Sequence, residues 1–224
     1  MPPEIARIVR THRRTLGLQI MPDASLVVHA PERISVGDIE RLILQKERWI
    51  IEKQRLARNM FGPPVRKAFT DGEEFLYLGE RYPLRIRDEG YGPLIFTGNE
   101  FHLPRRSLPQ ARERFVAWYR RRALKVFEDR LALYGEPSGL KPRVLKVSHA
   151  KKRWGSCNSL GTINVSWRLV MAPIHVVDSI AVHELAHLAE QNHSKRFWDK
   201  VRAIFPGYDQ ATDWLRKNQY QLEI

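Results

Sequence analysis

The sequence predicts an α+β protein in which a β-rich portion with one helix, residues 1–104, precedes a helical domain with a small β-sheet, residues 105–224. Three observations favour this class. Short runs of alternating apolar and polar residues, separated by glycine and proline, fill most of the first hundred positions. Longer stretches with helical periodicity follow them. Hydrophobic residues make up 43% of the chain, which is a globular composition and excludes a disordered protein.

The amino-terminal portion begins with a predicted hairpin. Apolar residues alternate over 16–20 and again over 26–30, and Pro22-Asp23-Ala24-Ser25 between them has turn chemistry. The capping-box pattern Ser35-Val36-Gly37-Asp38 then precedes apolar residues at helical spacing, which predicts a helix over about 36–58.

Two further strand pairs are predicted before residue 104. The first joins 75–78 to 82–86 through a turn that contains Gly79. The second joins 94–96 to 101–103 and is bounded by glycine and proline.

Helical periodicity dominates after residue 104. Apolar residues recur every four positions and predict one long amphipathic helix over about 107–134, whose outer face carries a cluster of arginines. Ser194 is expected to cap a short helix later in the chain. The remaining predicted elements are two strands at 143–148 and 162–168 and two helices at about 174–191 and 209–218.

Cysteine content, apolar runs and the first thirty residues exclude several classes of protein. The single cysteine, Cys157, excludes an intrachain disulfide framework and a zinc site built from cysteines alone. The longest strictly apolar run, 169–174, is far shorter than the roughly 20 residues of a transmembrane helix. Positions 1–30 contain no apolar segment typical of a signal peptide. We therefore expect a cytoplasmic protein that does not associate with membranes.

The net charge of +13 is concentrated in one segment. Residues 105–153 contain fifteen lysine and arginine residues against four acidic ones, so nearly the whole surplus lies there. Such a segment attracts anions, which predicts association with nucleic acid, nucleotides or an acidic protein surface. The same run of charge is also typical of a solvated helix face.

The most informative motif is His183-Glu184-Leu185-Ala186-His187, which lies in a predicted helix. Residues four apart share a helix face, so both imidazoles can reach one metal ion. Glu184 lies at the edge of that face, where its carboxylate can take a proton from water and pass it to a leaving group. His193 follows His187 at +6 and supplies a third nitrogen. The pattern predicts a metal site of His183, His187 and His193 with Glu184 as the catalytic base.

Three protein nitrogens with one open position are typical of catalytic zinc, so Zn²⁺ is the expected ion. We expect Cys157, in a different segment, to be a buried apolar residue and not a fourth ligand. A third histidine at +6 is also the metzincin spacing, but Glu190 stands where metzincins have a glycine, and no methionine follows the motif. A carboxylate ligand from a later helix would have to be Glu223 in the tail, which is implausible.

Several segments together resemble a known family. In the second half these are Arg153–Cys157, Ile163–Leu169, Ala172-Pro173, Val182–His187 and Asn192–Trp198. In the first half they are Leu16–Ile20, Ala30-Pro31, Lys46–Ile50 and Tyr77–Gly79. Read in order, they resemble the YgjP-like metallopeptidase family, which is related to the SprT-like and WLM zincins, over nearly the whole chain. The resemblance implies a zincin-like, zinc-dependent hydrolase domain with the three histidines as ligands and Glu184 as general base.

Three functions are compatible with these residues. The first is a zinc peptidase, in which a strand upstream of the active-site helix, expected at 162–168, pairs with an extended protein or peptide substrate. The second is a nucleoside triphosphate (UTP) pyrophosphohydrolase, a name that some family members carry, with Lys151, Lys152 and Arg153 holding phosphates. The third is a DNA-associated protein-binding module with a SprT-like fold, against which the retained Glu184 argues. The peptidase is favoured.

A few neighbouring residues have alternative roles. Arg153 is expected either to bind a substrate carboxylate or phosphate or to pair with an internal acid. Trp154 and Trp167 are expected to be core or platform aromatics, and Tyr208 either to pack or to stabilise an oxyanion. A carboxylate is expected to orient one zinc histidine, and the candidates are Asp178, Asp199, Asp209 and Asp213.

Overall fold

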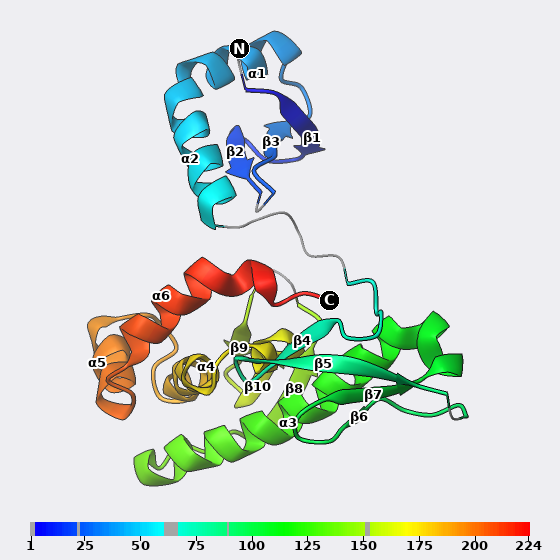
Figure 1. Ribbon diagram of the computed structural model, residues 1–224. Coiled ribbons are helices and arrows are strands. Elements are labelled where there is room, and N and C mark those ends of the chain that lie inside the picture. Colours follow the sequence, from blue (N-terminus) through cyan, green and yellow to red (C-terminus); the bar gives the residue numbers. More distant parts are fainter. Residues whose placement is uncertain (1–2, 22, 61–66, 89, 151–152) are drawn as a thin grey trace. The chain divides into compact units, whose positions relative to one another are not determined.

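A computed structural model describes the chain except for residues 1–2, 22, 61–66, 89 and 151–152. The chain divides between residues 65 and 66 into two compact units (Figure 1). Strands prevail in the amino-terminal region and helices after it, so the expected α+β class is confirmed. Within the described residues, no helix is both long and apolar enough to cross a membrane.

The first unit combines a three-stranded sheet with two helices. Its strands β1 (Ile5–Thr11), β2 (Gly17–Ile20) and β3 (Leu26–Pro31) lie in the order β1-β3-β2. β2 and β3 form the predicted antiparallel hairpin. β1 pairs in parallel with β3 and is an addition to the predicted elements.

The helices α1 (Val36–Gln45) and α2 (Glu47–Met60) replace the single helix expected over 36–58. Ser35 caps α1 as predicted, because its Oγ accepts a hydrogen bond from the Asp38 backbone N–H at 3.1 Å. The break at Lys46 has no glycine or proline to mark it in the sequence. Apolar side chains from the sheet and both helices form the core of this unit: Leu26, Val28, Ala30, Ile39, Ile43 and Ile50.

The second unit begins with a four-stranded sheet. Both predicted strand pairs are present as antiparallel pairs, β4 with β5 and β6 with β7, and β5 runs parallel to β7. The strands, in their order across the sheet, are β4 (Glu74–Tyr77), β5 (Glu80–Arg87), β7 (Phe101–Pro104) and β6 (Ile95–Phe96).

This sheet packs on the long predicted helix, which explains why the division between units does not fall at residue 104. The helix, α3 (Ala111–Ser138), follows the short 3-10 helix η1 (Arg105–Gln110). Phe75 of β4 stacks on Phe115 of α3 with ring centroids 4.0 Å apart. Residues 74–104 therefore share a core with the second half of the chain. The periodicity of a sequence predicts whether a segment is a helix or a strand, but it does not predict which hydrophobic core the segment packs into.

A second sheet follows α3 in the chain. β8 (Val144–Ser148) runs parallel to β10 (Thr162–Ser166), and β9 (Gly155–Cys157) runs antiparallel to β10, so the order is β8-β10-β9. The strand expected over 162–168 ends at Ser166, where the 3-10 helix η2 (Trp167–Met171) begins. β10 is thus the central strand, and β9 lies at an edge of the described sheet.

Three helices complete the second unit: α4 (Ile174–Ala186), α5 (Lys195–Ile204) and α6 (Tyr208–Asn218), followed by the 3-10 helix η3 (Gln219–Gln221). All residues of α4 from Val176 to Val182 are buried, so this helix forms the centre of the unit. α3, α5 and α6 all contact it. The motif residues at its end are therefore held by surrounding elements.

Candidate metal centre

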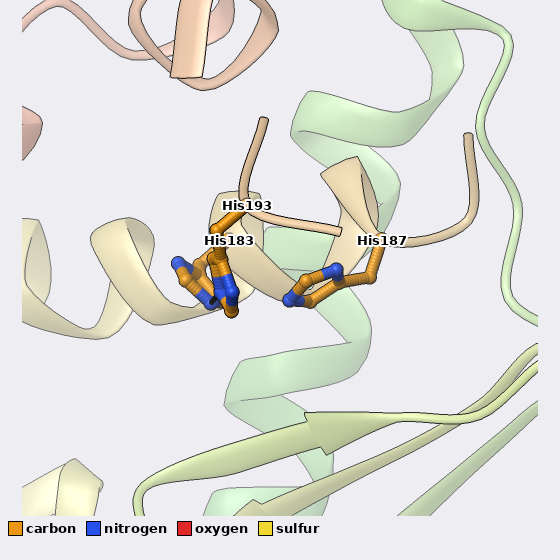
Figure 2. A group of neighbouring side chains, drawn as sticks. All are labelled: His183, His187 and His193. Atoms are coloured by element: carbon orange, nitrogen blue, oxygen red, sulfur yellow. Dashed lines mark hydrogen bonds between the residues drawn. The ribbon is translucent and has the colours of Figure 1, made fainter. Parts of the chain in front are cut away.

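The three predicted histidines come together at the end of α4 (Figure 2). One ligand nitrogen from each lies within 4.8 Å of the other two, and Nε2 of His193 is 3.1 Å from Nε2 of His183. A tetrahedral zinc ion with bonds of about 2.0–2.1 Å holds its nitrogens roughly 3.3–3.4 Å apart. Small side-chain rotations would bring His183, His187 and His193 to that spacing, so the residues present fit such an ion.

The end of α4 is what places His193 in this group. The helix was expected to continue to residue 191, but it ends at Ala186, with His187 as its C-cap. A continuous helix would carry His193 about 15 Å along the axis from His183, at 1.5 Å per residue. The chain instead turns over residues 188–192, without a glycine in the left-handed region, and returns His193 to the helix end.

Hydrogen bonds at Nδ1 orient the two helix histidines. Nδ1 of His183 lies 2.9 Å from the hydroxyl of Tyr208, the first residue of α6. Nδ1 of His187 donates to the backbone carbonyl of Glu190 at 3.0 Å. With Nδ1 engaged, Nε2 of each ring remains for a metal.

The expected orienting carboxylate is therefore replaced, for these two rings, by a hydroxyl and a carbonyl. Three of the candidate carboxylates pair with arginines: Asp178 with Arg130, Asp209 with Arg202 and Asp213 with Arg216. The hydroxyl of Tyr208 bonds to a ring nitrogen of His183, so Tyr208 positions this histidine. This contact does not support the oxyanion role considered for Tyr208.

Burial keeps His183 and His187 in the form that binds metal. Desolvation lowers the pKa of His183 to about 4, with further lowering from the nearby His187 and His193. Burial also lowers the pKa of His187. Aromatic rings of α5 surround the cluster: Phe197 lies 4.5 Å from His187 between ring centroids, and Trp198 stacks on His193 at 5.5 Å. At neutral pH the lone pairs of the His183 and His187 imidazoles are therefore unprotonated and available.

Glu184 is a buried carboxylate whose environment favours proton transfer. Its side chain is only 4% exposed, and Oε2 is buried without a hydrogen-bond partner. Burial raises the pKa of Glu184 to about 8, although the positive charge of Arg153 acts in the opposite direction. An orphaned buried polar atom is rare in folded proteins and marks a place for a ligand or for chemistry.

Gly155 of β9 makes room for this carboxylate, and the sequence motifs gave no reason for a glycine there. A Cβ atom at Gly155 would lie 2.3 Å from Oε1 of Glu184 and 2.7 Å from its Cδ. Gly155 is not among the glycines with positive φ, so the close approach of the side chain, and not the backbone conformation, requires glycine. A glycine inside a strand is a general signal for such an approach.

The other predicted residues lie in varied surroundings. Cys157 is not part of the histidine group. It was expected to be buried but is only half-buried. This partial burial raises the pKa of its thiol. Trp167 is a core residue, 1% exposed, whose Nε1 donates to Nδ1 of His149 at 3.2 Å. Glu223 pairs with the buried Arg168 at 3.1 Å and not with the histidines.

The strand segment before Gly155 is partly described. Trp154 is half-buried, and its backbone carbonyl accepts a hydrogen bond from the Ser166 N–H at 2.8 Å. The Arg153 side chain is exposed, and its charge acts on Glu184. Lys151 and Lys152, which were expected to hold phosphates, lie outside the described residues.

The comparison with family models agrees with a metallopeptidase. The family model of the YgjP-like metallopeptidase domain matches residues 14–218. Among solved structures, the metallopeptidase zymogen of Pyrococcus abyssi abylysin is 27% identical over a match that covers 42% of this chain and 95% of that chain, with a TM-score of 0.38. A search of curated proteins finds no significant match.

Proposed function

Because the chain belongs to the YgjP-like metallopeptidase family, we propose that it is a zinc-dependent peptidase in which His183, His187 and His193 hold the ion and Glu184 is the general base. The observation that carries this proposal is the buried carboxylate of Glu184, whose Oε2 has no hydrogen-bond partner and which lies next to His183 in the same helix. A structural metal site does not need such a group, whereas hydrolysis does.

The residues of the site have separable tasks. Zinc, when bound, supplies a Lewis acid that polarises a carbonyl and lowers the pKa of water. Glu184 accepts a proton from the attacking water and returns it to the leaving amine. Burial raises the pKa of Glu184 and so makes its carboxylate a stronger base, and the positive charge of a bound metal would keep that carboxylate ionised until it accepts the proton. Tyr208 and the Glu190 carbonyl keep the imidazoles of His183 and His187 oriented throughout.

The edge strand β9 supports a peptide as the substrate. Trp154 and Asn158 at its two ends bond to β10, since the Trp154 carbonyl accepts from Ser166 N–H and the Asn158 N–H donates to the Thr162 carbonyl. Backbone groups alternate in direction along an antiparallel strand, so those of Gly155 and Cys157 face the open edge. An extended peptide that pairs there lies next to Glu184.

This assignment moves the expected substrate strand. The segment 162–168 was expected to pair with substrate, but β10 already pairs with β8 on one side and with β9 on the other. Its backbone groups are therefore occupied, and β9 takes the role instead.

Hydrolysis of a nucleoside triphosphate such as UTP is a second candidate, supported by one observation. Arg153 is exposed, and its charge is felt at the Glu184 carboxylate, so it could contact a phosphate at the same site. Nucleic-acid association through residues 105–153 rests on the charge of that segment alone.

The test offers zinc-loaded protein a denatured protein substrate in one reaction and UTP in another. Glu184→Gln keeps the shape but removes the base, so hydrolysis should fall at least ~10²-fold while the zinc content stays constant. Glu190→Gln is the matched control, because it preserves the backbone carbonyl that holds His187. Undiminished hydrolysis by Glu184→Gln would show that another group is the base. Turnover of UTP without turnover of protein would replace the peptidase by the second candidate.

A further inference from the structure

The first unit contains a cavity of its own, at its sheet–helix junction. The volume is about 310 Å³, at the lower end of the roughly 300–1,000 Å³ of ligand pockets, which suits a few side chains and not a large cofactor. Strand-side residues and helix-side residues both line it: Leu16 and Leu18, and Leu42, Lys46 and Trp49. The Trp49 side chain is 40% exposed, so an aromatic surface is available to an apolar ligand.

An open strand edge borders this cavity. β2 pairs with β3 alone in the described sheet of the first unit. The Met21 N–H donates to the Ser25 carbonyl at 2.9 Å, and alternation from that pair directs the backbone groups of Gln19 and Gly17 toward β3. The N–H and C=O groups of Leu18 and Ile20 therefore point to the open edge, where they can pair with an added strand.

The cavity and the edge together have the layout of a strand-addition groove. In this mode an extended peptide pairs with an edge strand, and alternate side chains enter pockets between strand and helix. Here α2 contacts β2, as Figure 1 also shows, and Leu18 contributes both an edge backbone and a pocket-lining side chain. A peptide paired with Leu18 would place an apolar side chain against Trp49.

Charge indicates what flanks that apolar side chain. Lys46 lines the cavity on the face of Leu18, and the Arg13 guanidinium lies on the opposite face of β2, where a Cβ added at Gly17 would meet its Nη1 at 3.0 Å. The ion pairs of the described first unit are His12 with Glu32 and Arg41 with Asp38. Arg13 and Lys46 are not part of these pairs, so their charges are complementary to carboxylates of a ligand.

We propose that the groove between β2 and the helices of the first unit binds an extended peptide in which an apolar residue is flanked by acidic residues. This site is separate from the histidine cluster and does not rest on catalysis there. For a peptidase it would recruit proteins through a segment distinct from the cleaved one.

The test uses the full-length chain with Glu184→Gln, so that cleavage does not enter the measurement. The probe is a fluorescein-labelled ten-residue peptide whose central valine has two glutamates on each side, so that glutamates lie on both faces of the added strand. Binding is followed by fluorescence anisotropy. Trp49→Ala and Lys46→Glu should each weaken binding by about tenfold or more, as loss of a contact in the centre of an interface does. Ile51→Ala and Arg48→Glu are matched controls, because both residues are exposed on α2 and neither lines the cavity.

Hydrogen exchange supplies the second measurement. The peptide should slow exchange at the amides of Leu18 and Ile20, which are free in the groove, and not at Gln19, which bonds to β3. Equal losses for Lys46→Glu and Arg48→Glu, or no protection at Leu18 and Ile20, would overturn the proposal. If a single-stranded DNA oligonucleotide displaces the peptide, and Lys46→Glu and Arg48→Glu weaken DNA binding equally, the surface binds nucleic acid instead.

Discussion

Replacing Gly155 by alanine tests whether β9 is shaped around the carboxylate of Glu184. The added methyl group would lie 2.3 Å from Oε1 and 2.7 Å from Cδ. Ordinary contacts begin near 3.4 Å, so the carboxylate has to move by about 1 Å. A misplacement of about 1 Å in a catalytic group can cost ~10²-fold in rate. We therefore expect the kcat of Gly155→Ala to be roughly 1% of the unmodified value.

The same change should leave the fold and the metal content nearly unchanged. The backbone of Gly155 lies outside the left-handed region, so alanine fits its conformation. Replacing glycine at a compatible position stabilises by about 0.4–1 kcal/mol through the unfolded chain, which offsets part of the steric cost. We expect the free energy of unfolding to change by no more than about 1 kcal/mol. Zinc content should stay constant because no histidine is altered.

The assay measures hydrolysis of a denatured protein, zinc content and urea unfolding for the same preparations. Ser156→Ala is the control, since it alters the neighbouring residue of the same strand. A double-mutant cycle with Glu184→Gln isolates the mechanism: once the carboxylate is absent, Gly155→Ala should cost less than about threefold further. A loss of the same size in both backgrounds, or no loss in either, would refute the claim that Gly155 acts through Glu184.

Three further predictions concern the metal ligands and the buried carboxylate. The purified protein should hold about one divalent ion, and metal analysis of His193→Ala should show much lower occupancy, because one of three nitrogens is lost. Tyr208→Phe removes the partner of His183 Nδ1 and should weaken metal affinity about tenfold in competition with a chelator. In metal-free protein the contribution of Glu184 to stability should fall as pH rises, because native Glu184, with a pKa of about 8, keeps a proton that the unfolded chain, with a pKa near 4.3, has released. Between pH 6 and pH 8 this loss amounts to about 2 kcal/mol, and urea unfolding of Glu184→Gln should not show it.

The controls for these variants come from exposed residues of the same types. The His175→Ala variant, altered in the first turn of α4, should keep full metal occupancy. The Tyr91→Phe variant should keep the metal affinity of the unmodified chain. Full occupancy in His193→Ala would mean that His193 is not a ligand. An unchanged affinity in Tyr208→Phe would mean that the hydroxyl does not support His183. Parallel pH profiles for Glu184→Gln and the unmodified chain would show that this carboxylate is ionised in both states.

The sequence by itself determines the features that depend on neighbours along the chain. The hairpin of β2 and β3 and the cap of α1 at Ser35 were predicted, because alternation, turn residues and caps act over a few positions. The candidate metal residues were also predicted, since helical spacing alone places His183 and His187 on one face. For His193 the spacing indicated a third ligand, although it did not reveal the turn that brings this residue back.

Only the tertiary structure decides how distant segments meet at the site. Tyr208 reaches His183 from 25 positions away, and Gly155 of β9 approaches Glu184 of α4, contacts that no local pattern encodes. Sheet order is equally non-local: pairing on both sides makes β10 central and leaves β9 at the edge, so the strand that we propose for substrate is β9 and not β10. The boundary near residue 65 has the same origin, because a strand joins whichever core buries its apolar face, and Phe75 finds that core on α3.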